Sequence, residues 1–178
     1  MHCNQSFPRT PWPSPPVRCA AILALGLMLA GCGTAEQTPS APHYAAPDTQ
    51  GRNVTLADLR GNVVLVAVWA TWCPPCIEKL PELQRLHSEL SDEGLVLLGV
   101  NIDARDADAT VEAALARAGA RFRNLRDPDY RIMRSFALTG VPAYLLIDRA
   151  GRLHARWSME GNMSDLRREL QRLLRTEG

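Results

Sequence analysis

Two cysteines separated by two residues, Cys73 and Cys76, stand where a predicted strand meets a predicted helix. The preceding run 63–70 is apolar throughout, which is typical of a central strand covered on both faces. The segment from Pro74 onwards carries leucines at helical spacing: Leu80, Leu83, Leu86 and Leu90. A helix N-terminus offers partial positive charge and unpaired amide donors, and both stabilise a thiolate in the first turn. This placement predicts a nucleophilic cysteine suited to thiol–disulfide exchange.

Length and charge limit the other possibilities. The 178 residues, 46% of them hydrophobic, are enough for one domain with one core. The net charge is +1, and charges of both signs are mixed along the chain. We therefore expect no nucleic-acid partner, because that function needs a basic surface.

The N-terminus is typical of a targeting signal. Arg18 precedes an apolar run at 20–30 that is too short for a membrane span, which needs roughly 20 residues, but suits a signal peptide. The residues before Cys32 (Leu-Ala-Gly) resemble a bacterial lipobox, which implies cleavage after residue 31 and lipid attachment at Cys32. An uncleaved signal anchor is the alternative. Because 1–16 are rich in proline, we also hypothesise that translation starts at Val17.

The expected organisation is a lipoprotein signal peptide at 1–31, a flexible tether at 32–46 rich in Ala, Pro, Thr and Ser, and one folded domain at 47–178. Cys3 and Cys19 would leave with the signal, and Cys32 would carry lipid. Only Cys73 and Cys76 would remain as thiols.

Within the domain, predicted strands alternate with predicted helices. The strands are expected at 53–56, 63–70, 95–102, 122–125, 143–148 and 152–157, the last two joined as a hairpin. The helices are expected from Pro74 to Leu90 with a kink at Pro81, at 106–118, at 129–136, and from Ser164 onwards. This order predicts a mixed α/β sheet with helices on both faces.

The residues resemble the thioredoxin superfamily, specifically TlpA/ResA-like thiol–disulfide oxidoreductases. The resemblance runs from about Pro47 to Leu174. It rests on three segments: VTLADLRG at 54–61, WATWCPPC at 69–76, and TGVP at 139–142 before a strand. It implies a thioredoxin-like fold in which the material around 103–125 is the TlpA-type central insertion.

The resemblance also implies roles for the motif. Cys73 would be the exposed nucleophile that attacks a client disulfide, and Cys76 would resolve the mixed disulfide. Pro74 and Pro75 would restrict the loop and help to set its redox potential.

Three further residues belong to the implied substrate groove. Val141 and Pro142 would form a cis peptide facing the cysteines, with neighbouring backbone that pairs with the substrate. Trp72 matches the aromatic position beside the motif, as does Trp69.

Two positions depart from the family pattern. Many thioredoxins have a buried acid where this chain has Ala67, and ResA-like proteins have Glu where it has Lys79. Glu78 lies about 100° away around the helix axis and is a poor substitute. We hypothesise that Lys79 stabilises the thiolate and makes the pair more oxidising; a solvated surface lysine without a redox role is the alternative.

The cysteine pair has several alternative interpretations. A zinc site needs further ligands, and His43, His87 and His154 are widely separated, so we expect no metal and no cofactor. An inert structural disulfide, a non-catalytic lipoprotein chaperone or binding module, and a thiol peroxidase are the remaining alternatives.

The sequence therefore predicts a lipid-anchored extracytoplasmic thiol–disulfide oxidoreductase facing the periplasm. Family analogy favours reduction of disulfides in client proteins, as in cytochrome c maturation or copper-site assembly. A reductase there needs electrons, which implies a membrane thiol donor as a second partner.

Overall fold

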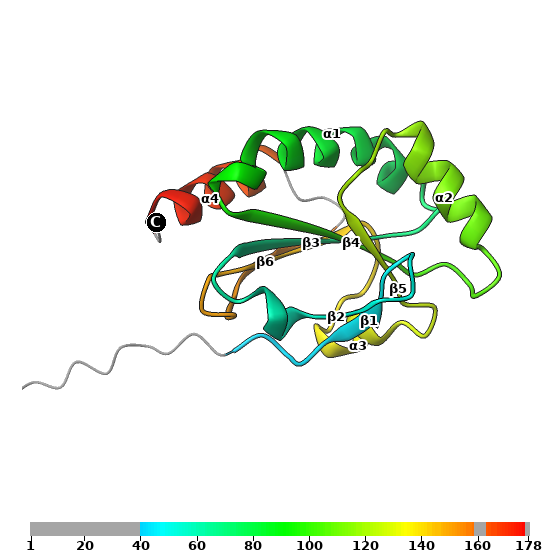
Figure 1. Ribbon diagram of the computed structural model, residues 1–178, viewed down its shortest axis with the longest axis horizontal. Helices are drawn as coiled ribbons and strands as arrows, with labels where there is room; N and C mark the ends of the chain where they lie inside the picture. The colour runs from blue at the N-terminus through cyan, green and yellow to red at the C-terminus, as the bar shows by residue number, and fades with distance from the viewer. Residues whose placement is uncertain (1–39, 159–162, 177–178) are drawn as a thin grey trace, which may run out of the picture. The chain divides into compact units, whose positions relative to one another are not determined.

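The computed structural model describes residues 40–158 and 163–176. Five strands form a central sheet in the order β5–β4–β3–β6–β7 (Figure 1). Strand β3 runs parallel to β4 and antiparallel to β6, while β4–β5 is parallel and β6–β7 antiparallel. The strands are β3 (Val63–Trp69), β4 (Leu95–Asn101), β5 (Arg123–Arg126), β6 (Ala143–Ile147) and β7 (Leu153–Trp157). The predicted mixed sheet and the terminal hairpin are confirmed.

Helices cover both faces of this sheet, as predicted. Figure 1 shows α1, α2 and α4 over one face, and α3 with the short strands β1 and β2 on the other. The helices are α1 (Pro74–Leu90), α2 (Asp108–Arg117), α3 (Arg131–Ser135) and α4 (Met163–Thr176), with 3₁₀ turns at Leu56–Leu59 and Ser91–Glu93.

The core forms where the sequence patterns place it. All seven residues of β3 are buried, because that strand is central and has a layer on each face. On α1 the buried apolar residues are Leu80, Leu83, Leu86 and Leu90, which form one stripe of the helix. Together these two elements fix the direction in which the chain enters and leaves the Cys-x-x-Cys turn.

The folded part begins before the predicted boundary at residue 47. Ala41 N donates to Gly151 O at 2.9 Å, and the ring of Tyr44 is 4% exposed. Strand β1 (Ala45–Pro47) pairs with β2 (Asn53–Thr55). The expectation that the tether reaches residue 46 is therefore wrong for 41–46, because this stretch buries an aromatic ring and pairs its backbone. Its small residues gave no apolar periodicity to reveal that.

Other element boundaries differ by a few residues. The helices expected at 106–118 and 129–136 are shorter, and α1 continues through Pro81. The predicted signal peptide, Cys32 and the tether before residue 40 lie outside the described residues. Within 40–158 and 163–176, no helix has the length and apolar character needed to cross a membrane.

The expected insertion contributes α2 and the edge strand β5. Gly99 of β4 stands opposite Asn124 of β5, and a Cβ at Gly99 would lie 1.8 Å from Asn124 Oδ1. That oxygen accepts a hydrogen bond from Trp69 Nε1 at 3.1 Å. The absence of a side chain at Gly99 thus lets the insertion hold the end of β3, immediately before the cysteine turn.

Candidate active site

The two cysteines form a disulfide at the N-terminus of α1. Cys73 and Cys76 have Cα atoms 5.3 Å apart and are 5% and 2% exposed. The expectation that Cys73 is exposed is therefore wrong for this disulfide form, in which the side chain packs into the core. Cys73 is the N-cap of the helix, and its Sγ accepts a hydrogen bond from Cys76 N at 3.3 Å. The Cys73 sulfur therefore already occupies a position where helix amide dipoles favour negative charge.

Pro74 and Pro75 occupy the first two positions of α1, and both are exposed. Proline suits these positions because its missing N–H is one that the helix leaves unpaired, and its φ is already helical. The next amides, of Cys76 and Ile77, both donate to Cys73 O, at 3.0 and 3.2 Å. The turn is consequently held by its backbone and leaves few alternative conformations for the cysteines.

The two tryptophans near the motif have different environments. Trp69 is buried at the end of β3 and donates to Asn124. Trp72, directly before Cys73, is 60% exposed. An exposed indole beside a disulfide gives an apolar surface on which a client segment can pack.

The Val141–Pro142 peptide bond is cis. Ala143 pairs with Val68 in the antiparallel β3–β6 ladder, so Pro142 comes to the same edge of the sheet as the cysteine turn. Tyr144 follows Ala143 in β6 and is buried. Its burial and, to a lesser extent, the negative charge of Glu82 raise the pKa of the Tyr144 hydroxyl to about 12. The β3–β6 register thus brings the cis-proline loop and the cysteine turn, which are far apart in the chain, to the same end of the sheet.

The residues expected to tune the thiol lie on the outer part of α1. Lys79 Nζ pairs with Glu82 Oε2 at 3.0 Å, and their side chains are 41% and 35% exposed. Glu78 is exposed. Lys79 is thus neither desolvated nor unpaired, and Glu82 is a partner that the sequence pattern did not single out.

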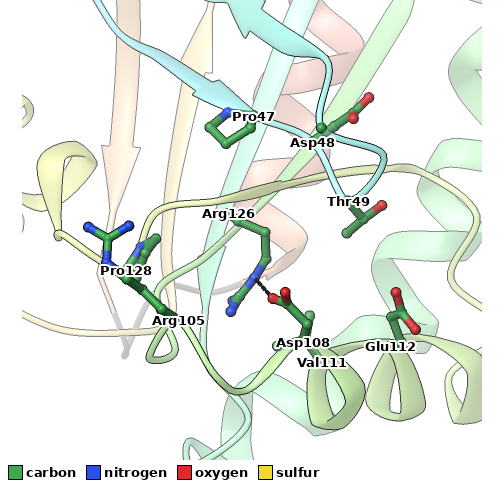
Figure 2. Close-up of a pocket in the computed structure, with 10 residues that line it drawn as sticks. Pro47, Asp48, Thr49, Arg105, Asp108, Val111, Glu112, Arg126 and Pro128 are labelled. Carbon is green, nitrogen blue, oxygen red and sulfur yellow. Dashed lines mark hydrogen bonds and ion pairs between the residues drawn. The ribbon is translucent and has the colours of Figure 1, made fainter.

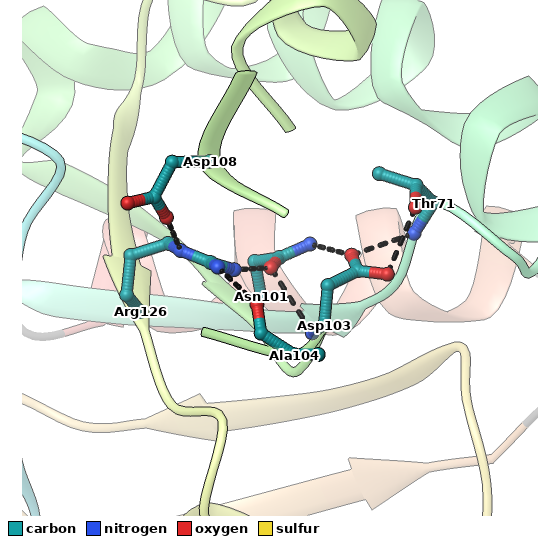
Figure 3. Close-up of polar contacts among 6 residues, drawn as sticks. All are labelled: Thr71, Asn101, Asp103, Ala104, Asp108 and Arg126. Carbon is teal, nitrogen blue, oxygen red and sulfur yellow. Dashed lines mark hydrogen bonds and ion pairs between the residues drawn. The ribbon is translucent and has the colours of Figure 1, made fainter. Parts of the chain in front are cut away.

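The buried carboxylate of Asp103, next to the turn, is a further polar group that the sequence pattern did not single out. Asp103 follows β4 and accepts hydrogen bonds from both the backbone N and the Oγ1 of Thr71, each at 2.8 Å (Figure 3). Two polar residues at the end of an otherwise apolar strand, Asn101 and Asp103, were the signal that could have found it.

Three hollows surround this region. One is a cleft of about 350 Å³ between the β1–β2 turn and the inserted segment, with the Arg126–Asp108 ion pair on its wall (Figure 2). A second, between α1 and α2, includes Thr71 and Ile77. A third includes Thr139 and Gly140, just before the cis proline. The cysteines line none of the three.

A metal centre is not evident in the described part of the chain. Across 40–158 and 163–176, no three or more His, Cys, Asp or Glu side chains gather as a metal site would require. His154 instead contacts Glu169 on α4, and the ring of His87 packs edge-on against Phe122.

Comparison with known proteins agrees with this geometry. A family model described as the AhpC/TSA family matches residues 38–156. The thiol–disulfide oxidoreductase ResA of Bacillus thuringiensis (strain Al Hakam) is 27% identical over 113 residues, which are 64% of this chain and 64% of ResA. The chain thus spans just under two thirds of that relative's length.

Solved structures show the same architecture. A proposed thiol:disulfide interchange protein DsbE from Chlorobium tepidum is 29% identical, with a TM-score of 0.70, over 78% of this chain and 98% of that one. The thioredoxin domain of a thiol–disulfide oxidoreductase from Bacteroides vulgatus is 25% identical, with a TM-score of 0.68, over 77% and 96%. The expected α/β thioredoxin-like fold is confirmed, and the chain belongs to the AhpC/TSA family, with ResA-type and DsbE-type proteins among its homologues.

Proposed function

We propose that this protein is a thiol–disulfide oxidoreductase whose Cys73–Cys76 pair exchanges electrons with disulfides of client proteins. The observation that carries the proposal is the position of the pair at the N-terminus of α1, with Cys73 as the N-cap. The similarity to ResA-type and DsbE-type proteins supports it.

In the reducing direction the pair starts as a dithiol. The Cys73 thiolate attacks one sulfur of a client disulfide, forming a mixed disulfide and releasing the other client sulfur as a thiolate. The Cys76 thiolate then attacks Cys73 Sγ, which frees the second client sulfur and forms the Cys73–Cys76 disulfide. Two electrons have passed to the client, whose sulfurs take up two protons. A membrane thiol donor must return two electrons to complete the cycle.

Position in the turn favours Cys73 as the attacking residue, although both cysteines are buried in the disulfide form. It precedes the helix and follows the exposed Trp72, whereas Cys76 lies within the helix. Val141 and Pro142, at the same edge of the sheet, would flank a bound client segment. The proposed groove is therefore formed by Trp72, the two motif prolines and the cis-proline loop.

The cellular setting belongs to the same proposal. The signal-like run and the Leu-Ala-Gly-Cys sequence ending at Cys32 support lipid attachment to a bacterial membrane, with the domain in the periplasm. The clients would be disulfide-containing proteins, with apocytochrome c and copper-site assembly proteins as candidates. A Cys32→Ala chain that still takes up radioactive palmitate and fractionates with membranes would refute the lipid anchor.

The first experiment traps the pair in living cells. Acid quenching followed by alkylation reads the redox state on the tryptic peptide 61–79, which contains no other cysteine. A mostly reduced pair is expected for a reductase. A mostly oxidised pair would contradict this direction and indicate an oxidase.

A matched pair of variants tests the order of attack. Cys76→Ser should accumulate mixed disulfides with clients because the resolving thiol is gone, while Cys73→Ser should accumulate none. Equal trapping by both variants would refute the assignment of Cys73. Full rescue of a deletion strain by the double Ala variant would favour a binding module, and peroxide consumption coupled to a thiol reductant would favour a peroxidase.

A further inference from the structure

Asp103 is a buried carboxylate that the exchange chemistry above does not use. Its side chain accepts three hydrogen bonds: from Thr71 N and Thr71 Oγ1 at 2.8 Å each, and from Asn101 Nδ2 at 2.6 Å. Asp103 N in turn donates to Asn101 Oδ1 at 3.1 Å. Asp103 is 3% exposed and Asn101 fully buried, so water screens little of this charge.

A cation from the inserted segment lies on the far side of Asn101. Arg126 of β5 donates to Asn101 Oδ1, to Ala104 O at 2.8 Å, and to Asp108 Oδ1 at 2.7 Å (Figure 3). Its side chain is 10% exposed and forms part of the wall of the cleft in Figure 2. The chain of contacts therefore leads from the insertion, through Asn101 and Asp103, to the turn before the redox pair.

The carboxylate is close to the nucleophile. Thr71 precedes Cys73 by two residues, and two residues of chain span at most about 7 Å, so Asp103 Oδ2 lies no more than about 12 Å from Cys73 Cα. Cys73 N also donates to Ala70 O at 3.3 Å, which closes the turn in which Asp103 accepts hydrogen bonds from Thr71.

We propose that Asp103 is a positioning residue of the redox pair: it fixes the turn that presents Cys73, and its buried charge, moderated by Arg126, disfavours the Cys73 thiolate and keeps the pair reducing. The inference rests on the proposed exchange function. The helix N-terminus favours the thiolate and Asp103 opposes it, so the two together set the balance between dithiol and disulfide. This gives the chain an acid near the redox pair although Ala67 and Lys79 replace the two usual ones.

The test compares variants of the full-length chain equilibrated with glutathione redox buffers, with the dithiol-to-disulfide ratio read on peptide 61–79. Asp103→Asn keeps the shape and removes the charge. At a buffer pH where Cys73 of the dithiol is ionised, we expect it to shift the ratio toward the dithiol by about three- to tenfold, the effect of one charge at that distance for an effective dielectric constant between roughly 40 and 20. The pKa of Cys73, read from alkylation rate against pH in the Cys76→Ser background, should fall.

Arg126→Gln gives a test of sign. Without the Arg126 cation, the negative charge of Asp103 is less compensated and destabilises the Cys73 thiolate more strongly. The dithiol-to-disulfide ratio should therefore move toward the disulfide. The other charged groups around the turn, Glu78, Lys79 and Glu82 on α1 and Arg117 on α2, are unchanged in both variants.

Asp148→Asn is the matched control. Asp148 is also 3% exposed and accepts from Arg152 N at 2.9 Å and Nε at 2.7 Å, but it follows β6 at the opposite edge of the sheet. The Asp148→Asn substitution should lower the midpoint of thermal unfolding without changing the dithiol-to-disulfide ratio in glutathione buffer. A ratio that Asp103→Asn leaves within about twofold of the wild type, an equal shift in Asp148→Asn, or a shift of the same sign in Arg126→Gln would overturn the inference. Failure of the wild-type pair to exchange with glutathione at all would instead refute the proposed function.

Discussion

Replacing Gly99 with alanine should destabilise the protein through one identified clash. The new Cβ would lie 1.8 Å from Asn124 Oδ1 and 2.7 Å from its Cγ, distances that real Cβ atoms do not reach. Asn124 is 4% exposed, so its amide is packed against its neighbours. Displacing it would remove the acceptor of Trp69 Nε1 and the bond from Asn124 Nδ2 to Phe122 O at 3.0 Å.

The expected cost follows from these losses. A buried indole N–H without an acceptor costs about 1–3 kcal/mol, and forcing extra volume into a packed core costs about 1–3 kcal/mol more. Gly99→Ala should therefore lower the free energy of unfolding by about 2–6 kcal/mol. Urea unfolding followed by circular dichroism measures this, provided that the slope with urea stays unchanged.

A double-mutant cycle isolates the cause. In an Asn124→Ala background the clashing amide is absent and the nearest remaining atom is Phe122 Cε2 at 3.2 Å, which needs only a small shift. Gly99→Ala should then cost less than about 1 kcal/mol, so the two changes should be strongly non-additive. An equal cost of Gly99→Ala in both backgrounds would refute the reasoning. Gly51→Ala, at a φ of 78° in open space, reports the cost of backbone strain alone.

Four further predictions follow from the described contacts. Lys79→Glu should make the redox pair more reducing, and no change or the reverse change in the glutathione ratio would contradict a role for Lys79. Leu83→Ala should lower the free energy of unfolding by about 2–5 kcal/mol in urea titrations, because the side chain is 2% exposed in the core. Trp72→Ala should leave that free energy unchanged but slow the reduction of a protein disulfide, which an insulin reduction assay measures. Hydrogen bonds from Arg172 and then His154 lower the pKa of Glu169 to about 2 from 4.5, so its stabilisation is present above about pH 4.5 and lost as the pH falls toward 2; thermal unfolding of Glu169→Gln should lack this part of the acid sensitivity.

The sequence was informative where one local pattern had one structural solution. The apolar run at 63–70 is a covered strand, as predicted, and the leucines of α1 are buried as their spacing predicted. Turn signals around Arg149 and Gly151 placed the terminal hairpin correctly. In each case periodicity and turn chemistry act within a few residues and need no distant partner.

The sequence was less informative where distant residues decide. Residues 41–46 were expected to be tether because they carry no periodicity, yet the Tyr44 ring is buried by tertiary contacts. The requirement for glycine at 99 comes from Asn124, which is brought opposite by the β4–β5 register. Neither fact has a local signal.

By itself the sequence determined the strand–cysteine–helix junction, the order of the elements from β2 onwards and the chemistry expected of the cysteine pair, because propensity, spacing and thiol chemistry are local properties. Only the tertiary structure decided what surrounds that pair: the cis proline at the same sheet edge and Asp103 next to the turn. These neighbours come from separate strands and helices, and the energies of burial and hydrogen bonding that join them exist only once the sheet has formed.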